Sequence, residues 1–183
     1  RYGQGDWWIE LYEGADCGNL KNLGCYTNSF PVNGVFLKDL TVGATYYLRF
    51  GSPASSAHAF QICLGHYPTP LNDDCTGALP LTVHGDLNCY YPSSGNTASS
   101  TASQPATACL DKNDVWFRFK ALQPTHRIAI NKQTSVEDGT QQRLTMELLT
   151  GDCSNLTPLS CWPDSLQNPG TTILITDLEP GHT

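Results

Sequence analysis

The feature that most constrains the fold of this chain is a cysteine-bounded segment that occurs twice. "CGNLKNLGC" (17–25) and "CSNLTPLSC" (153–161) have the same length, the same Asn-Leu pair and the same second leucine. The flanking sequences are similar too, and Gly43 aligns with Gly181. The aligned positions are 136 to 138 residues apart, as from 17 to 153 and from 43 to 181. This spacing is too long for a solenoid repeat and matches a whole β-sandwich domain.

The repeat predicts that the chain contains parts of two homologous domains. Residues 1–66 correspond to the C-terminal half of one domain. Residues 75–183 correspond to most of the next domain, whose last strands are expected to follow Thr183. Residues 67–74 contain two prolines, which favour extended backbone, and are expected to form a short, semi-rigid linker. We therefore expect the chain to be one stretch of a longer tandem array.

Apolar and polar residues alternate with a period of two in many short segments, and helical periodicity is absent. These segments end at Gly, Asn, Asp or Pro, as strands in antiparallel sheets do. The pattern predicts an all-β fold, an antiparallel and jelly-roll-like β-sandwich that is repeated and stapled by disulfides. The expected strands are residues 7–14, 45–50, 59–64, 114–121, 127–130, 143–149 and 171–178.

The composition excludes several classes of function. Eight cysteines, none of them in a C-x-x-C pair, argue for disulfides in an oxidising compartment rather than for a zinc site. The net charge is −7 and basic residues do not cluster, which argues against nucleic acids and anionic membranes as partners. No apolar run approaches the roughly 20 residues that span a bilayer. The sequence therefore predicts a secreted or cell-surface protein that does not insert into a membrane.

Local spacing suggests how the cysteines pair. The two nine-residue segments would each close a loop worth roughly 2.5 kcal/mol in the chain-entropy model. Cys63 and Cys75 flank the linker and would stiffen it by bonding each other, or each could bond a partner inside its own domain, beyond the ends of this sequence. Eight cysteines allow about 105 pairings, so spacing alone leaves this open. The predicted pairs are Cys17–Cys25, Cys153–Cys161, Cys89–Cys109 and Cys63–Cys75.

Three stretches carry a resemblance to a known family: "LNDDCTGALPLTV" (71–83), "DKNDVWFRFKA" (111–121) and "MELLTGDCSNLTPLSC" (146–161). The sequence resembles the cysteine-containing adhesin-type sandwiches that are repeated in large secreted and surface proteins of Bacteroidota. Those sandwiches are relatives of bacterial prepeptidase C-terminal domains. The resemblance covers nearly the whole chain. It implies a jelly-roll-like sandwich, an accessory role beside enzymes or in long adhesins, and export through the type IX route.

The resemblance also implies a calcium site, because some prepeptidase C-terminal domains bind calcium through acidic and Asn side chains. Short oxygen-bearing side chains from two converging segments suit this hard cation. The competing interpretation is that these residues serve turns. No other cofactor is expected. The matching positions are Asn72, Asp73, Asp74, Asp111 and Asp114.

No catalytic motif is present, and we expect the chain not to be an enzyme. The first functional interpretation is a structural or adhesive repeat that contacts neighbouring copies head to tail or by strand addition. The alternative is a carbohydrate- or protein-binding module of a secreted hydrolase, with Trp8 and Trp162 as exposed stacking aromatics. "DSL" (164–166) matches a short O-glycosylation signal that would place a sugar on Ser165, and "NLT" at Asn155 matches an N-glycosylation signal.

Overall fold

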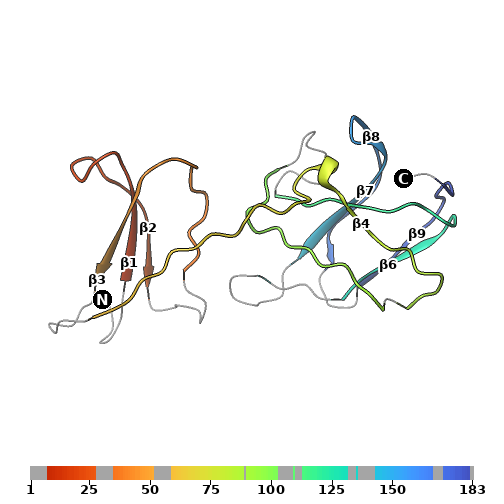
Figure 1. Cartoon of the computed structure of the whole chain (residues 1–183), viewed down its shortest axis with the longest axis horizontal. Helices are drawn as coiled ribbons and strands as arrows, with labels where there is room; N and C mark the ends of the chain where they lie inside the picture. Colours follow the sequence, from red (N-terminus) through yellow and green to blue (C-terminus); the bar gives the residue numbers. More distant parts are fainter. Residues whose placement is uncertain are drawn as a thin grey trace. The chain divides into compact units, whose positions relative to one another are not determined.

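The chain folds into two compact units, unit 1 (Arg1–Leu64) and unit 2 (Gly65–Thr183). Within the described ranges the secondary structure is β, apart from one short 3-10 turn, η1 (Cys75–Gly77) (Figure 1). The computed structural model describes residues 8–27, 35–51, 59–88, 90–102, 109, 113–131, 135, 143–166 and 171–181.

Unit 1 is a three-stranded antiparallel sheet in the order β2-β1-β3. Its central strand has one apolar and one polar face, because side chains alternate along a strand. On the apolar face Leu11, only 3% exposed, lies opposite Leu48. On the polar face Glu10 lies between Cys25 and Arg49, and its carboxylate is 3.3 Å from the Arg49 guanidinium. The strands are β1 (Trp8–Glu13), β2 (Lys21–Thr27) and β3 (Tyr46–Gly51).

Unit 2 contains two antiparallel strand pairs, β6–β9 and β7–β8, and one parallel pair, β4–β5. The long hairpin β7–β8 has a tight turn at residues 153–154, while β6 and β9 are distant in sequence (Figure 1). The strands are β4 (Leu79–Pro80), β5 (Phe117–Arg118), β6 (His126–Ile130), β7 (Leu144–Asp152), β8 (Asn155–Leu166) and β9 (Thr171–Ile175).

The core of unit 2 lies between its two antiparallel strand pairs. Ile173 and Ile175 of β9 are 6% and 4% exposed, whereas Leu174 between them is 63% exposed. This is the alternation expected of a strand with one face buried. The side chains that pack against the two isoleucines come from β6, β7, β8 and two adjoining segments: Ile128, Ile130, Met146, Leu148, Trp162, Phe119 and Leu178.

The structure confirms the all-β prediction and corrects three details of it. The pairing of β4 with β5 is parallel, although an antiparallel fold was expected. Residues 59–64, a predicted strand, form no strand, and Phe60, Ile62 and Leu64 are exposed. An alternating strand needs a neighbouring strand for its hydrogen bonds, and no strand in the described part of unit 1 pairs with this segment, although the Phe60 ring lies 5.2 Å from the ring of Phe50 in β3.

The third correction concerns the cysteine segments, which were interpreted as loops. Both contain strand: β2 covers residues 21–25 of the first segment, and β8 covers 155–161 of the second. Asn22, Gly24 and Pro158 have low strand propensity and concealed the alternation. Pro158 is tolerated because it lies next to an irregularity in the pairing, between Leu148 and Leu149 of β7.

Replacement of Ile175 by alanine should destabilise unit 2 by about 2–5 kcal/mol, because a buried isoleucine leaves a cavity. The matched variant Leu174→Ala should change stability by less than about 0.5 kcal/mol, since that side chain faces solvent. Urea unfolding, followed by hydrogen exchange of the β6 and β9 amides, measures both. Equal effects of the two variants would contradict the register of β9.

Candidate functional site

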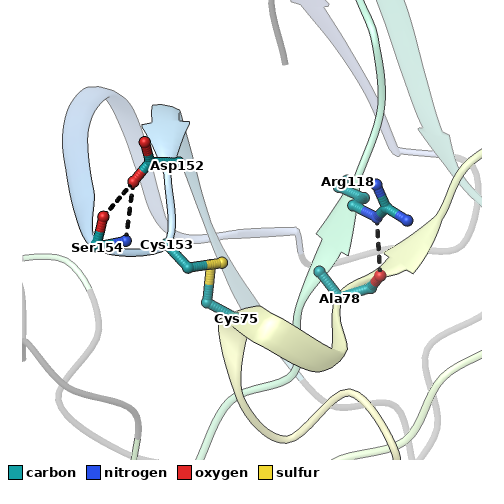
Figure 2. The surroundings of a disulfide bond; sticks show 6 residues. All are labelled: Cys75, Ala78, Arg118, Asp152, Cys153 and Ser154. Carbon is teal, nitrogen blue, oxygen red and sulfur yellow. Dashed lines mark hydrogen bonds between the residues drawn. A yellow bond between two sulfur atoms is a disulfide. The ribbon is translucent and has the colours of Figure 1, made fainter.

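The tip of the β7–β8 hairpin is held by a short hydrogen-bonded turn. The Asp152 carboxylate accepts hydrogen bonds from the Ser154 backbone N–H (3.1 Å) and from the Ser154 hydroxyl (2.5 Å). The hydroxyl and then the N–H of Ser154 lower the pKa of Asp152 below its ordinary value. Gly151 precedes this turn at φ 110°, where a Cβ atom would lie 2.4 Å from the Asn155 carbonyl oxygen, so glycine is required there. The turn presents Cys153 at the tip (Figure 2).

A disulfide joins this tip to the start of unit 2. Cys153 is bonded to Cys75 of η1, 78 residues earlier in the sequence (Figure 2). The carbonyl oxygen of Ala78, which follows η1, accepts a hydrogen bond from the Arg118 side chain of β5 at 3.2 Å. η1 is therefore anchored covalently to the hairpin and by a hydrogen bond to β5. Closing a loop of this length stabilises the folded chain by roughly 4–5 kcal/mol in the chain-entropy model.

A second disulfide, between Cys109 and Cys161, ties the same hairpin to another segment, 52 residues earlier. Cys161 lies in β8 opposite Glu147, and its neighbour Trp162 packs against the core. Since adjacent residues of a strand point to opposite faces, the bond is on the face of the hairpin away from the core. In sequence the two disulfides interleave: Cys75, Cys109, Cys153, Cys161.

These bonds contradict the pairing predicted from local spacing. The segment between Cys153 and Cys161 is mostly β8, and the six residue-to-residue steps from Asn155 to Cys161 span roughly 20 Å at about 3.3 Å each. A disulfide requires Cα atoms within roughly 7 Å, so this pair is too far apart. Cys75 instead bonds Cys153, which lies inside its own unit and within this sequence. The pairs Cys153–Cys161, Cys89–Cys109 and Cys63–Cys75 are wrong, because Cys75, Cys109, Cys153 and Cys161 have other partners.

The fourth predicted pair, Cys17–Cys25, is not formed either. Both residues and Cys63 are exposed free thiols. Cys25 lies in β2 and Cys17 in the turn before it, so extended backbone separates this pair as well. Cys89 lies outside the described residues.

The predicted calcium ligands include two that hold unit 2 together. Asn72, 4% exposed, donates its side-chain amide to the Trp116 carbonyl oxygen, and its own carbonyl accepts the Trp116 N–H, both at 2.8 Å. Asp73 accepts two hydrogen bonds from Thr101, one from its N–H (2.6 Å) and one from its hydroxyl (2.9 Å). These contacts link the opening segment to two later segments, and they fit the structural interpretation of both residues.

The described acidic residues of the predicted calcium set do not form a cluster. Asp74 is exposed beside η1, where its carbonyl oxygen accepts the Gly77 N–H at 2.9 Å. Asp114 donates its N–H to the Thr101 carbonyl at 3.3 Å. Within the described ranges, no three acidic, histidine or cysteine side chains come close enough to share a cation. Asp111 lies outside those ranges.

The tryptophans predicted to stack on a ligand are both half-buried. Trp162 packs against Ile173 and Ile175 in the core of unit 2. Trp8 lies opposite Gly51, and a Cβ atom on that glycine would be 2.1 Å from the indole ring. The ring therefore covers the backbone of β3, an arrangement that shields a strand glycine. Ser165, the predicted glycosylation site, belongs to β8, but its side chain is outside the described part.

The β1–β2 hairpin of unit 1 has the same geometry as β7–β8. Glu10 pairs with Cys25 as Glu147 pairs with Cys161. One residue further along, both pairings shift at an irregularity, after Leu11 in β1 and after Leu148 in β7. The sequence alone predicted the alignment of these segments but not their shared irregularity.

The turns of the two hairpins match as well. The Asp16 carboxylate accepts the Gly18 N–H at 2.7 Å, as Asp152 accepts that of Ser154 at 3.1 Å. A Cβ atom on Gly14 would lie 2.6 Å from the Asn19 carbonyl oxygen, close to the 2.4 Å found for Gly151. Cys17 and Cys153 therefore occupy the same place at the tip.

The Asp152 carboxyl should titrate below 3.8, its ordinary pKa. A lowered folded-state pKa stabilises the fold above the unfolded-state value, and this stabilisation is lost as the pH falls through the folded-state value. Ser154→Ala removes the largest cause, so it should raise the pKa towards 3.8 and leave only the effect of backbone N–H groups. Carbon-13 NMR titration of the carboxyl groups measures this shift. Asp86, whose pKa is lowered mainly by the Asn88 N–H, is the internal control. An unchanged Asp152 pKa in Ser154→Ala would contradict the hydroxyl contact.

Three findings concern the environment of the chain and its similarity to known proteins. The two disulfides indicate an oxidising environment of the extracellular kind. Within the described ranges, no helix is long and apolar enough to cross a membrane. No family model, curated protein or solved structure matches the chain.

Proposed function

We propose that the chain is a non-catalytic structural or adhesive stretch of a long extracellular protein, built from repeats of one disulfide-stapled sandwich. The observation that carries this proposal is the hairpin that occurs in both units. Its pairing register, its irregularity and its turn are all reproduced at an offset of 136 to 137 residues, as from 17 to 153 and from 10 to 147. Such agreement at domain-length spacing is typical of tandem domains that arose by duplication.

The disulfides fit a structural role, in which the repeats make the protein long and hold it together. Cys75 and Cys153 enclose most of the residues of unit 2, and Cys109–Cys161 interleaves with that bond. When a force pulls on both ends of unit 2, the residues outside the disulfides extend first. The two disulfides then bear the force. Neighbouring copies of the repeat are the partners we propose, in contact head to tail or by strand addition. The proposal includes the jelly-roll topology, the likeness to Bacteroidota adhesin sandwiches, and secretion to the cell surface.

The binding-module alternative has less support. It depended on Trp8 and Trp162 as exposed stacking surfaces, and both side chains are engaged in packing. A sugar-binding platform of tryptophans requires ring faces open to the ligand. The structural interpretation needs no such surface.

A peptide map of the natural polypeptide, with its denatured mass, tests the proposal. The expected result is a mass well above 20.0 kDa, with further peptides on the pattern of residues 17–25 and 146–161. Flanking peptides that carry a catalytic motif instead of the repeat would support the module of a hydrolase and overturn the structural proposal. A polypeptide without a further copy of the cysteine segment would also overturn it.

A further inference from the structure

Two thiols of unit 1 occupy the positions that are disulfide-bonded in unit 2. Cys17 is at the hairpin tip, as Cys153 is, and Cys25 pairs with the central-strand glutamate, as Cys161 does. In unit 2 these positions are bonded to Cys75 and Cys109, whereas Cys17 and Cys25 are exposed thiols. The local geometry is the same, and the described part of unit 1 holds no counterpart of the segment that carries Cys75 and Cys109 in unit 2.

We propose that Cys17 and Cys25 are the attachment points for a further copy of the segment that precedes β7 in unit 2, here called the leading segment (residues 65–143). The copy of Cys75 would bond Cys17, and the copy of Cys109 would bond Cys25. This inference rests on the proposed function, because it takes the partner to be another copy of the same repeat. It adds the residues through which one half of a repeat is fixed covalently to the other.

The apolar side of unit 1 points to the same partner. Asp39 and Gly43 have positive φ angles of 57° and 87°, and their counterparts Asp177 and Gly181 have 61° and 98°. This correspondence places residues 35–37 at the positions of 173–175 in β9.

The two segments differ in what covers them. In unit 2 the residues Ile173 and Ile175 are buried, partly by Ile128 and Ile130 of the paired strand β6. Within the described part of unit 1, no strand pairs with residues 35–37, and the side chains of this segment are half-buried. A copied leading segment would bring a copy of β6 to this edge. It would therefore bury the apolar segment and reach both thiols.

The bonds form by ordinary thiol–disulfide exchange. A thiolate of one partner attacks a disulfide oxidant of the oxidised-glutathione class, giving a mixed disulfide and releasing one reduced thiol. The second partner then attacks the mixed disulfide, closing the protein disulfide and releasing the other reduced thiol. Each protein bond thus consumes one oxidant disulfide, and two protons leave the protein thiols.

The test is an extended chain, in which a copy of residues 65–143 is fused directly ahead of residue 7 of the full chain. The copy then stands at the same spacing from Glu10 of β1 as the original does from Glu147 of β7. A Thr76→Ser change in the copy marks its Cys75 peptide by mass, at a position that is exposed. The protein is refolded in a glutathione redox buffer, and its disulfides are mapped by mass spectrometry without reduction.

The expected result is a marked Cys75 peptide linked to the Cys17 peptide, with Cys25 linked to a Cys109 peptide. Both thiols should then lose their reactivity towards iodoacetamide. Cys25→Ser should remove one link and keep the other, and the matched control Cys63→Ser should keep both. A Cys17–Cys25 link, or two thiols that stay reactive while Cys75–Cys153 forms, would overturn the inference.

A second measurement remains decisive if the extended chain does not fold. In the unextended chain in the same buffer, Cys17 and Cys25 should both react with iodoacetamide and should not link to each other. A Cys17–Cys25 bond there would overturn the inference. If either experiment fails while the natural polypeptide still yields repeated cysteine peptides, this attachment is rejected. The repeat proposal then stands.

Discussion

The structure of unit 2 depends on one covalent constraint, the bond that joins the tip of a hairpin to a segment 78 residues earlier. The fully buried apolar side chains of this unit, within its described ranges, are only Ala121, Ile173 and Ile175. A core of this size gives limited hydrophobic stabilisation, since each buried aliphatic side chain contributes roughly 1.5–3 kcal/mol. Each of the two disulfides contributes a stabilisation of similar order, roughly 4–5 kcal/mol in the chain-entropy model. Cross-links of this kind suit a protein that has left the reducing interior of the cell.

Strand geometry determines how one hairpin serves both the core and the cross-links. Met146, Leu148 and Trp162 point towards β9, while Cys161 lies on the opposite face. The second cysteine, Cys153, is at the tip, where the turn formed by Asp152 and Ser154 presents it to η1. The same hairpin can therefore pack against the core with one face and form disulfides to two other segments through its tip and its other face. In unit 1 the equivalent hairpin packs through Leu11 and presents free thiols at the same two places.

Sequence reasoning succeeded where a signal was local and periodic. Alternation identified β1, β3, β6, β7 and β9. It failed for the disulfides, because cysteine spacing was interpreted as loop length. Low strand propensity at Asn22 and Pro158 hid β2 and β8, and without those strands Cys17–Cys25 and Cys153–Cys161 looked close. The roles of Asn72 and Asp73 could not be predicted either, since their partners Trp116 and Thr101 are brought near only by the tertiary fold.

The central claim is that no hairpin cysteine bonds within its own hairpin, and a disulfide map of this chain tests it most directly. Digestion without reduction, after alkylation of free thiols, should release a Cys75–Cys153 peptide pair and a Cys109–Cys161 pair. Alkylated peptides should contain Cys17, Cys25 and Cys63. A Cys153–Cys161 or Cys17–Cys25 linkage within one peptide segment would contradict the account. It would mean that the cysteine segments are closed loops rather than parts of stapled strands.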